Sequence, residues 1–168
     1  MARNELGYSL VELLVVSSLL LLLLLGVSTL FIASLTADAR ITLRQELRAE
    51  GNYALDSMSY FIRNAKALPE CQPGGSRLSV LNEDGRVTEY SVSSNQIASY
   101  SAAFAPFPER TDLLTVSPYE VETGSFVLDC NNVNQPYVTI SFTLTRTDSQ
   151  GTAIENDFRH TVLVRNQL

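Results

Sequence analysis

The longest uncharged stretch of the sequence runs from Leu13 to Ala37 and contains the unbroken leucine run Leu19–Leu25. A helix needs about 20 consecutive apolar residues to cross a bilayer, so this stretch is long enough to span one. Its few polar side chains are hydroxyls, which can bond back to the helix backbone. The sequence therefore predicts a single membrane-spanning helix near the N-terminus, followed by a more polar folded part.

The residues before this stretch do not follow the order of an ordinary secretory signal peptide. Such a peptide has a basic start, an apolar stretch of about 7–15 residues and a small-residue cleavage site. Here the apolar stretch is longer, and Gly7 and Glu12 precede it. A carboxylate at the mouth of a membrane helix is costly unless something compensates it. Either Glu12 lies among lipid headgroups, where the positive end of the helix dipole favours it by about 0.3–1 kcal/mol, or it pairs with a cation of a neighbouring subunit.

The segment Gly-Tyr-Ser-Leu-Val-Glu-Leu-Leu-Val-Val, residues 7–16, resembles the class III prepilin signal of type IV pilins and pseudopilins. The shared features are a short polar leader, a glycine, a glutamate as the fifth residue after it, and a long apolar helix. The resemblance implies that a prepilin peptidase cuts between Gly7 and Tyr8 and that the same enzyme N-methylates Tyr8. Cleavage creates an α-amino group on Tyr8 that is mostly cationic at neutral pH. In an apolar helix bundle this amine can pair with Glu12 of an adjacent subunit and set the axial register.

Downstream of the span, apolar residues continue to recur at helical spacing, among them Leu47, Leu55, Met58 and Ile62. We expect this helix to end before Pro69. The predicted segments are a leader at 1–7, a transmembrane or filament-core helix at 8–37, an amphipathic helix at 38–68 and a β-rich periplasmic or extracellular domain at 69–168. The predicted fold class is α+β, with the long N-terminal helix packed on a C-terminal antiparallel β-sheet, as in pilins.

Strand signals fill the C-terminal part. A hairpin is expected from residues 77–81 and 86–92, which flank a turn at 82–85, and a third strand at 96–100. Residues 102–109 are expected to form an exposed loop. Shorter strands are predicted at 113–116 and 125–130. The clearest alternation of apolar and polar residues runs over 138–145, which should turn at 148–151 and return to Val164.

Two cysteines, Cys71 and Cys130, fall in the part expected to lie outside the cytoplasm. Oxidation is favoured there, so we predict one disulfide between them; two separate buried thiols are the alternative. Closing a loop of this length stabilises a domain by roughly 4 kcal/mol in the chain-entropy treatment.

No motif indicates an enzyme, a cofactor or a resident metal. The single histidine, His160, has no cysteine or carboxylate at ligand spacing and is expected to be an ordinary strand residue. Asp112, Asp129, Asn131 and Asn132 carry oxygen ligands that calcium accepts, but their spacing matches no calcium loop, so solvated loop residues are the favoured interpretation. The 12 Lys and Arg are scattered among 18 Asp and Glu, giving a net charge of -6, so nucleic acid is not a predicted partner.

These observations favour a structural protein: a minor pilin or pseudopilin of a type IV pilus or type II secretion system. Its subtype loosely resembles the J-type minor pseudopilins and the W-type minor pilins. The resemblance implies other pilins or pseudopilins, prepilin peptidase and an inner-membrane assembly platform as partners. It places the chain as a single-pass protein of the inner membrane and then of a filament, with the C-terminal domain outside the cytoplasm. The rival interpretation is a single-span anchor that displays a binding or sensory domain and never polymerises. The sequence does not separate secretion, pilus and competence systems.

Overall fold

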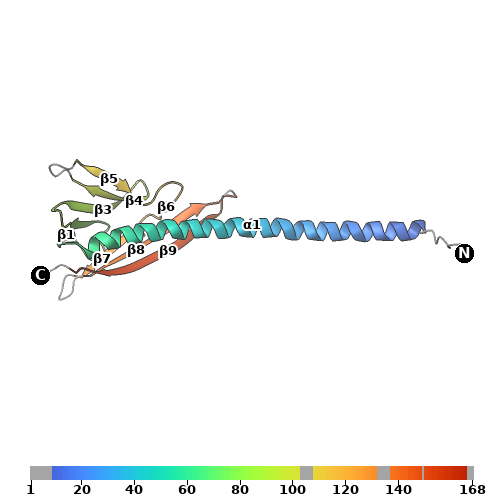
Figure 1. The fold of residues 1–168 in the computed structure, drawn as a ribbon, viewed down its shortest axis with the longest axis horizontal. Coiled ribbons are helices and arrows are strands. Elements are labelled where there is room, and N and C mark those ends of the chain that lie inside the picture. The colour runs from blue at the N-terminus through green and yellow to red at the C-terminus, as the bar shows by residue number, and fades with distance from the viewer. Residues whose placement is uncertain (1–8, 103–107, 132–136, 149, 166–168) are drawn as a thin grey trace, which may run out of the picture. The chain divides into compact units, whose positions relative to one another are not determined.

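The computed structural model describes residues 9–102, 108–131, 137–148 and 150–165, and it divides into two compact units, Met1–Thr42 and Leu43–Leu168. Within these ranges one long helix is followed by strands, and each neighbouring pair of strands runs antiparallel (Figure 1). In chain order the elements are α1 (Leu10–Arg63), β1 (Ala67–Cys71), β2 (Leu78–Leu81), β3 (Val87–Ser93), β4 (Gln96–Ser101), β5 (Arg110–Leu113), β6 (Glu120–Val121), β7 (Val127–Asn131), β8 (Tyr137–Thr147) and β9 (Ala153–Leu163). The predicted α+β class is confirmed.

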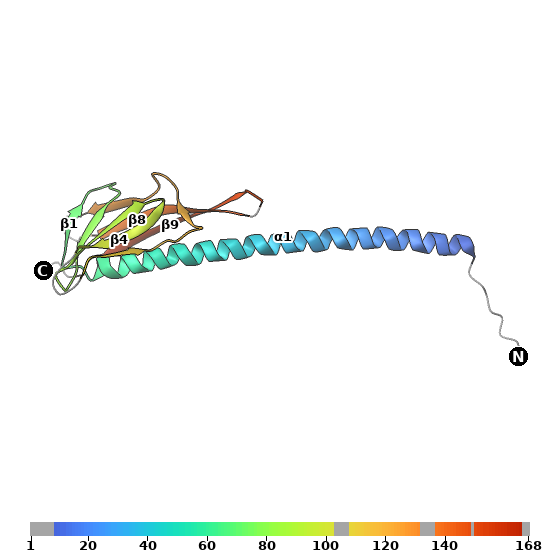
Figure 2. The same cartoon turned by 90° about the horizontal axis from the view of Figure 1, so that it is seen from above.

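The C-terminal half of α1 packs on the strands through one face. The residues it buries recur every three or four positions, as one side of a helix requires: Leu47, Gly51, Ala54, Leu55, Met58, Ser59 and Ile62. The strands lie on one side of this part of the helix (Figure 2). Its burial against them forms the core of the second unit, so the amphipathic pattern in the sequence correctly predicted which side faces inward.

The helix ends at Arg63, before the predicted boundary at Leu68. The amide nitrogen of the Asn64 side chain donates to the carbonyl of Tyr60 at 2.9 Å, which satisfies one of the last helical acceptors. Leu68 precedes a proline and is therefore disfavoured in helical geometry. Pro69 lies inside β1, the outermost strand of its sheet, where its missing N–H removes no required ladder bond.

The strands form two sheets where the sequence predicted one. The first has five strands in the order β1-β2-β3-β4-β5. In the second, β8 pairs with β6 and β7 and also with β9, and the β8–β9 pairing runs from Tyr137↔Leu163 to Thr147↔Ala153. The predicted hairpins at 77–92 and 138–164 are confirmed, as are the strands near 96–100 and 125–130.

Three other expectations about strands need comment. The strand predicted at 113–116 is wrong, because β5 occupies Arg110–Leu113 and the chain then bends. Leu114 is instead buried in that bend, and its N–H donates to the carbonyl of Ile97 at 2.7 Å. Strands β1 and β6 were not predicted, since β1 contains a proline and β6 has only two residues. Part of the loop predicted at 102–109 lies outside the described residues.

A disulfide joins Cys71 at the end of β1 to Cys130 in β7, with their Cα atoms 5.8 Å apart. It therefore links the two sheets. An isolated bridge also joins Gly75, in the segment between β1 and β2, to Leu128 of β7. The disulfide predicted from the sequence is present, and no free cysteine remains.

Candidate assembly site at the start of the helix

The first turn of α1 is closed by Ser9. Its hydroxyl oxygen accepts a hydrogen bond from the backbone N–H of Glu12 at 3.2 Å, and its carbonyl accepts one from the N–H of Leu13 at 3.2 Å. A serine N-cap with glutamate three residues later is the capping-box pattern, which satisfies donors that the first turn leaves unpaired. The Ser-x-x-Glu spacing signals this cap in the sequence, although the prediction for Glu12 above rests on the prepilin resemblance and on the cost of a charge at the membrane.

Glu12 is the acidic residue of this first turn, a position that the helix dipole favours. It is the one charged residue between Ser9 and Ala37. Its neighbours are apolar and open, with Leu10 80% and Leu13 67% exposed. No basic side chain forms an ion pair with it within the described part of the chain. Among the described residues, the helix dipole is therefore what compensates this carboxylate at the end of the apolar helix.

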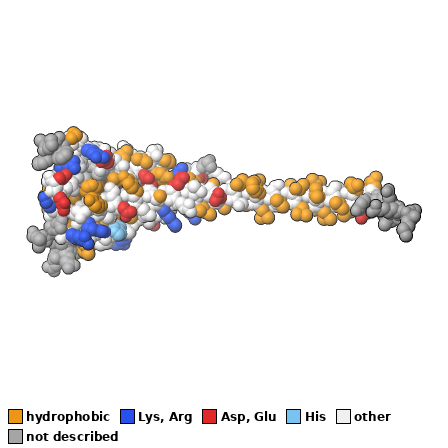
Figure 3. Space-filling model, viewed as in Figure 1, with side chains coloured by type: hydrophobic (Ala, Val, Ile, Leu, Met, Phe, Trp, Pro, Cys, Tyr) orange, Lys and Arg blue, Asp and Glu red, His pale blue; other side chains and the backbone are white. Residues whose placement is uncertain are grey.

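The apolar rod itself is uncovered. Every large hydrophobic side chain from Leu10 to Leu35 is between 52% and 80% exposed, and hydrophobic atoms dominate this surface (Figure 3). By length and composition the helix can cross a membrane, and a signal sequence near an N-terminus would meet the same test. Leaving so much apolar surface in water is unfavourable by about 25 cal/mol per Å². This surface therefore requires lipid or other apolar helices around it.

Most of the hydroxyl side chains within the span are satisfied by the helix. The hydroxyls of Ser17, Ser18, Ser28 and Thr29 donate to backbone carbonyls three or four residues earlier, at 2.8–3.0 Å. These four hydroxyls therefore need no hydrogen-bond partner from the lipid. Gly26 has open space on all sides, since an added Cβ would meet no atom within 4 Å.

Gly7 and Tyr8 lie outside the described residues. Their predicted roles in cleavage and methylation therefore stay predictions, as does the pairing of the Tyr8 amine with Glu12. The structure adds that the helix begins two residues after Tyr8, so a cut at Gly7 would place the new amine next to the capped first turn.

In the second unit the helix is fastened to the strands by a polar cluster that the sequence did not predict. Arg146 of β8 pairs with Glu46 of α1, and its guanidinium lies 5.0 Å from the centre of the Tyr119 ring. Glu50 accepts the backbone N–H of Val116 at 2.9 Å. Burial raises the pKa of the Tyr119 hydroxyl above its usual range, against the lowering effect of Arg146. Partners 100 residues apart give no local signal, so sequence periodicity could not have found this contact.

The described residues that were considered above for catalysis or calcium binding lie on different strands. His160 is exposed on β9, and Asp129 is exposed on β7. Asp112 is engaged by the Nε of Arg110 at 2.7 Å. Asn132 lies outside the described residues. Among the residues that are described, no group of three or more His, Cys, Asp or Glu side chains is placed to hold a metal ion.

Comparisons of the chain with protein families, with curated proteins and with solved structures find no match. The assignment therefore depends on the chain's own features. A long apolar N-terminal helix, antiparallel β-sheets behind it and a disulfide together form a pilin-like architecture.

Proposed function

We propose that the protein is a minor pilin or pseudopilin, cut by prepilin peptidase and assembled through α1 into a helical filament of a type IV pilus or type II secretion system. The observation that carries this proposal is the order of features at the N-terminus: Gly7, then Glu12, then an apolar helix whose whole surface is uncovered. A lipid anchor needs only the apolar helix. A chain that is cut after Gly7 and polymerised uses the glycine and the charge of the glutamate as well.

In this proposal two opposite charges at the start of the helix, the Tyr8 ammonium group and the Glu12 carboxylate, pair between neighbouring subunits. Cleavage after Gly7 leaves an ammonium group on Tyr8, with or without a methyl group. When helices leave the membrane and bundle, that cation and the Glu12 carboxylate of a neighbour meet in a low-dielectric environment, where pairing is strongly favoured over isolation. One buried ion pair per subunit then defines how far each helix is shifted along its neighbour.

The same proposal assigns the location and the partners. Before assembly the chain lies in the inner membrane with the disulfide-bonded unit outside the cytoplasm, where oxidation is favoured. Prepilin peptidase processes it, an inner-membrane assembly platform extracts it, and other pilins or pseudopilins surround its helix. A separate cytoplasmic ATPase supplies the energy, since the sequence contains no nucleotide-binding motif.

One observation favours the rival function, a membrane-anchored binding or sensory domain that does not polymerise. The helix dipole favours a carboxylate in the first turn, and the Ser9 cap binds the backbone N–H of Glu12, so neither feature requires a partner subunit. A test must therefore separate the charge of Glu12 from its place in the cap.

The variant Glu12→Gln makes this separation, because glutamine also serves at this position of a capping box. We expect it to insert in the membrane normally but to be lost from the filament fraction, measured by immunoblot of sheared filaments or cross-linked assemblies from the native host. Ser9→Ala is the matched control: it removes the cap at a cost of about 1 kcal/mol and keeps the carboxylate, so it should assemble if its cleavage is unchanged. Filaments that contain the Glu12→Gln variant at wild-type levels would show that the charge has no role in assembly.

A further inference from the structure

A polar hollow of about 380 Å³ lies in the second unit beside the C-terminal half of α1. The helix lines it with Tyr53, Ser57 and Phe61, which recur every four residues along one side. Opposite them are side chains of β3, β4 and β5. The elements on both sides belong to the same compact unit, so the hollow does not depend on how the membrane helix is placed.

The pairing register explains why this hollow is polar. Leu78 of β2 pairs with Tyr90, Tyr90 with Ser99, and Ser99 with Asp112, so these residues share one face of the five-stranded sheet. Along that row the side chains change from apolar at β2 to polar at β4 and β5. The next row repeats the change in the order Val80, Thr88, Ser101 and Arg110. The face of the sheet that is apolar and buried at β2 is therefore polar at β4 and β5, where it forms the floor of the hollow.

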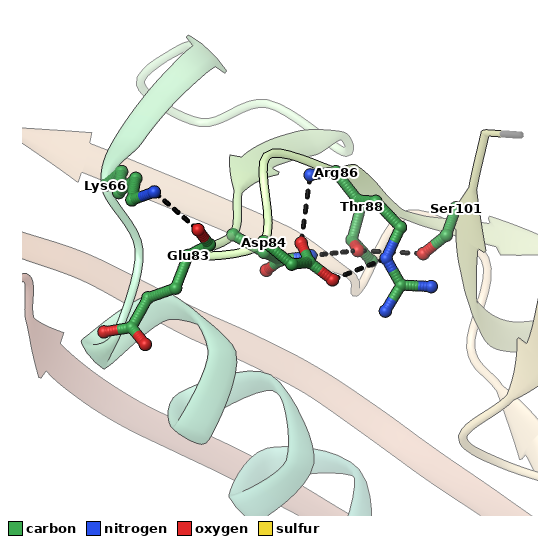
Figure 4. Close-up of polar contacts among 7 residues, drawn as sticks. Lys66, Glu83, Asp84, Arg86, Thr88 and Ser101 are labelled. Carbon is green, nitrogen blue, oxygen red and sulfur yellow. Dashed lines mark hydrogen bonds and ion pairs between the residues drawn. The ribbon is translucent and has the colours of Figure 1, made fainter. Parts of the chain in front are cut away.

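The floor is held in place by its own hydrogen bonds. The side-chain amide of Asn82 donates to the Thr88 hydroxyl at 2.8 Å, and the Thr88 and Ser101 hydroxyls are 2.9 Å apart (Figure 4). Two arginines reach the hollow, and each is neutralised by an aspartate: Arg86 by Asp84 at 2.6 Å and Arg110 by Asp112 at 2.7 Å. The hollow therefore offers many donors and acceptors at fixed positions with little net charge, which disfavours a strongly ionic ligand.

The wall opposite this floor is aromatic. Tyr53 is 61% exposed and Phe61 is 39% exposed, and eight residues of helix separate them by about 12 Å. Tyr90 also lines the hollow; it is 1% exposed, and its hydroxyl has no hydrogen-bond partner among the described residues. Because this hydroxyl is buried, the groups open to a ligand are those of the more exposed residues around it.

From this combination we infer that the hollow binds a neutral oligosaccharide. Sugar rings have apolar C–H faces that pack on aromatic rings, and rims of hydroxyls that both donate and accept hydrogen bonds. Tyr53 provides the ring, while Ser99, Ser101 and the Arg110–Asp112 pair provide the complementary polar groups. An extended peptide is less suited, because it would pair with the outer backbone edge of β5 and leave the hydroxyl floor unused. This binding does not rest on filament assembly.

The test uses the full chain in lipid nanodiscs, since the sugar headgroup of a glycoside detergent would compete. Maltohexaose, cellohexaose and chitohexaose are each titrated and followed by saturation-transfer NMR. We expect at least one of them to bind. Tyr53→Ala should then weaken its affinity by about three- to tenfold, because the stacking surface is lost, and Tyr53→Phe should restore it. Near-UV circular dichroism confirms that each variant remains folded.

Tyr60→Ala is the matched control, because Tyr60 is on the same helix and 66% exposed but does not line this hollow. It should bind as the wild type does. The inference is overturned if none of the three sugars gives a transfer signal, if Tyr60→Ala and Tyr53→Ala weaken binding equally, or if only a neutral Gly-Ser-Thr hexapeptide binds.

Discussion

Gly51 shows how a single residue joins the helix to the sheet. A Cβ atom at this position would lie 2.1 Å from Cζ of Phe158, so the ring of Phe158 occupies the space that any other residue would need. That ring cannot easily retreat, because it is 6% exposed and stacks on Phe142 with 5.1 Å between ring centres. By propensity alone a glycine weakens a helix by about 1 kcal/mol, and here close packing explains its presence.

The variant Gly51→Ala should therefore destabilise the protein despite its better helix propensity. We expect a loss of about 1–3 kcal/mol in the free energy of unfolding, as overpacked cores show, measured by denaturant titration with near-UV circular dichroism in nanodiscs. Gly26→Ala is the control, because the space around Gly26 is open, and it should leave the unfolding of the second unit unchanged. A Gly51→Ala chain as stable as the wild type would mean that the helix and β9 are not in close contact.

Tyr90 provides a test that depends on pH. Its hydroxyl is buried without a partner among the described residues, and burial raises its pKa far above the usual value. The raised pKa means that the folded state holds the proton more tightly than the unfolded state. The associated stability is complete below about pH 10, the ordinary tyrosine pKa, and is lost as the pH rises beyond it.

We expect Tyr90→Phe to keep the wild-type stability at neutral pH or raise it by up to about 1 kcal/mol, since an unpaired buried hydroxyl is removed. Above pH 10 the variant should lose less stability than the wild type, because phenylalanine does not ionise. Denaturant midpoints at about pH 7 and about pH 10.5, on either side of the ordinary tyrosine pKa, measure both effects. A large loss at neutral pH would instead mean that the hydroxyl has a bonding partner in the folded protein.

At the scale of elements, the disulfide is the covalent link between the two sheets, since β1 belongs to one and β7 to the other. Replacing both Cys71 and Cys130 with serine should lower the free energy of unfolding by up to roughly 4 kcal/mol. Reducing the wild-type protein should also lower its denaturant midpoint, while the midpoint of the double variant should not change when reductant is added. A wild-type midpoint that reductant leaves unmoved would contradict this role.

The elements that sequence reasoning predicted well are those with strong local patterns. The uncharged span, the alternation across 138–145 and the turn signals at 82–85 and 148–151 each specify structure from near neighbours alone. The division of the strands into two sheets could not be predicted, because it depends on which distant strands pair. The same limit applies to the Glu46–Arg146 contact. β1 was missed because Pro69 argues against a strand everywhere except at a sheet edge.

At the candidate assembly site, the sequence was informative for similar reasons. The helix start and the place of Glu12 in its first turn follow from local signals, as do the hydrogen bonds that most hydroxyls of the span make to the helix backbone. The partner of Glu12 does not, because in the proposed mechanism it belongs to another subunit and exists only after proteolysis.

For the whole molecule, the two units differ in whether they bury their own apolar surface. Residues 43–168 bury a core of their own, while the helix of the first unit exposes an apolar surface that only lipid or other helices can cover. A membrane anchor and a filament subunit both meet that description. They differ in whether the first seven residues are removed, and this difference is the central claim of the proposed function.

The most direct measurement is the intact mass of the full chain after co-expression with a prepilin peptidase. The proposal predicts a mature protein that begins at Tyr8, with or without one added methyl group, and a Gly7→Val chain that stays uncut. A wild-type protein that retains residues 1–7 in the presence of active peptidase would contradict it.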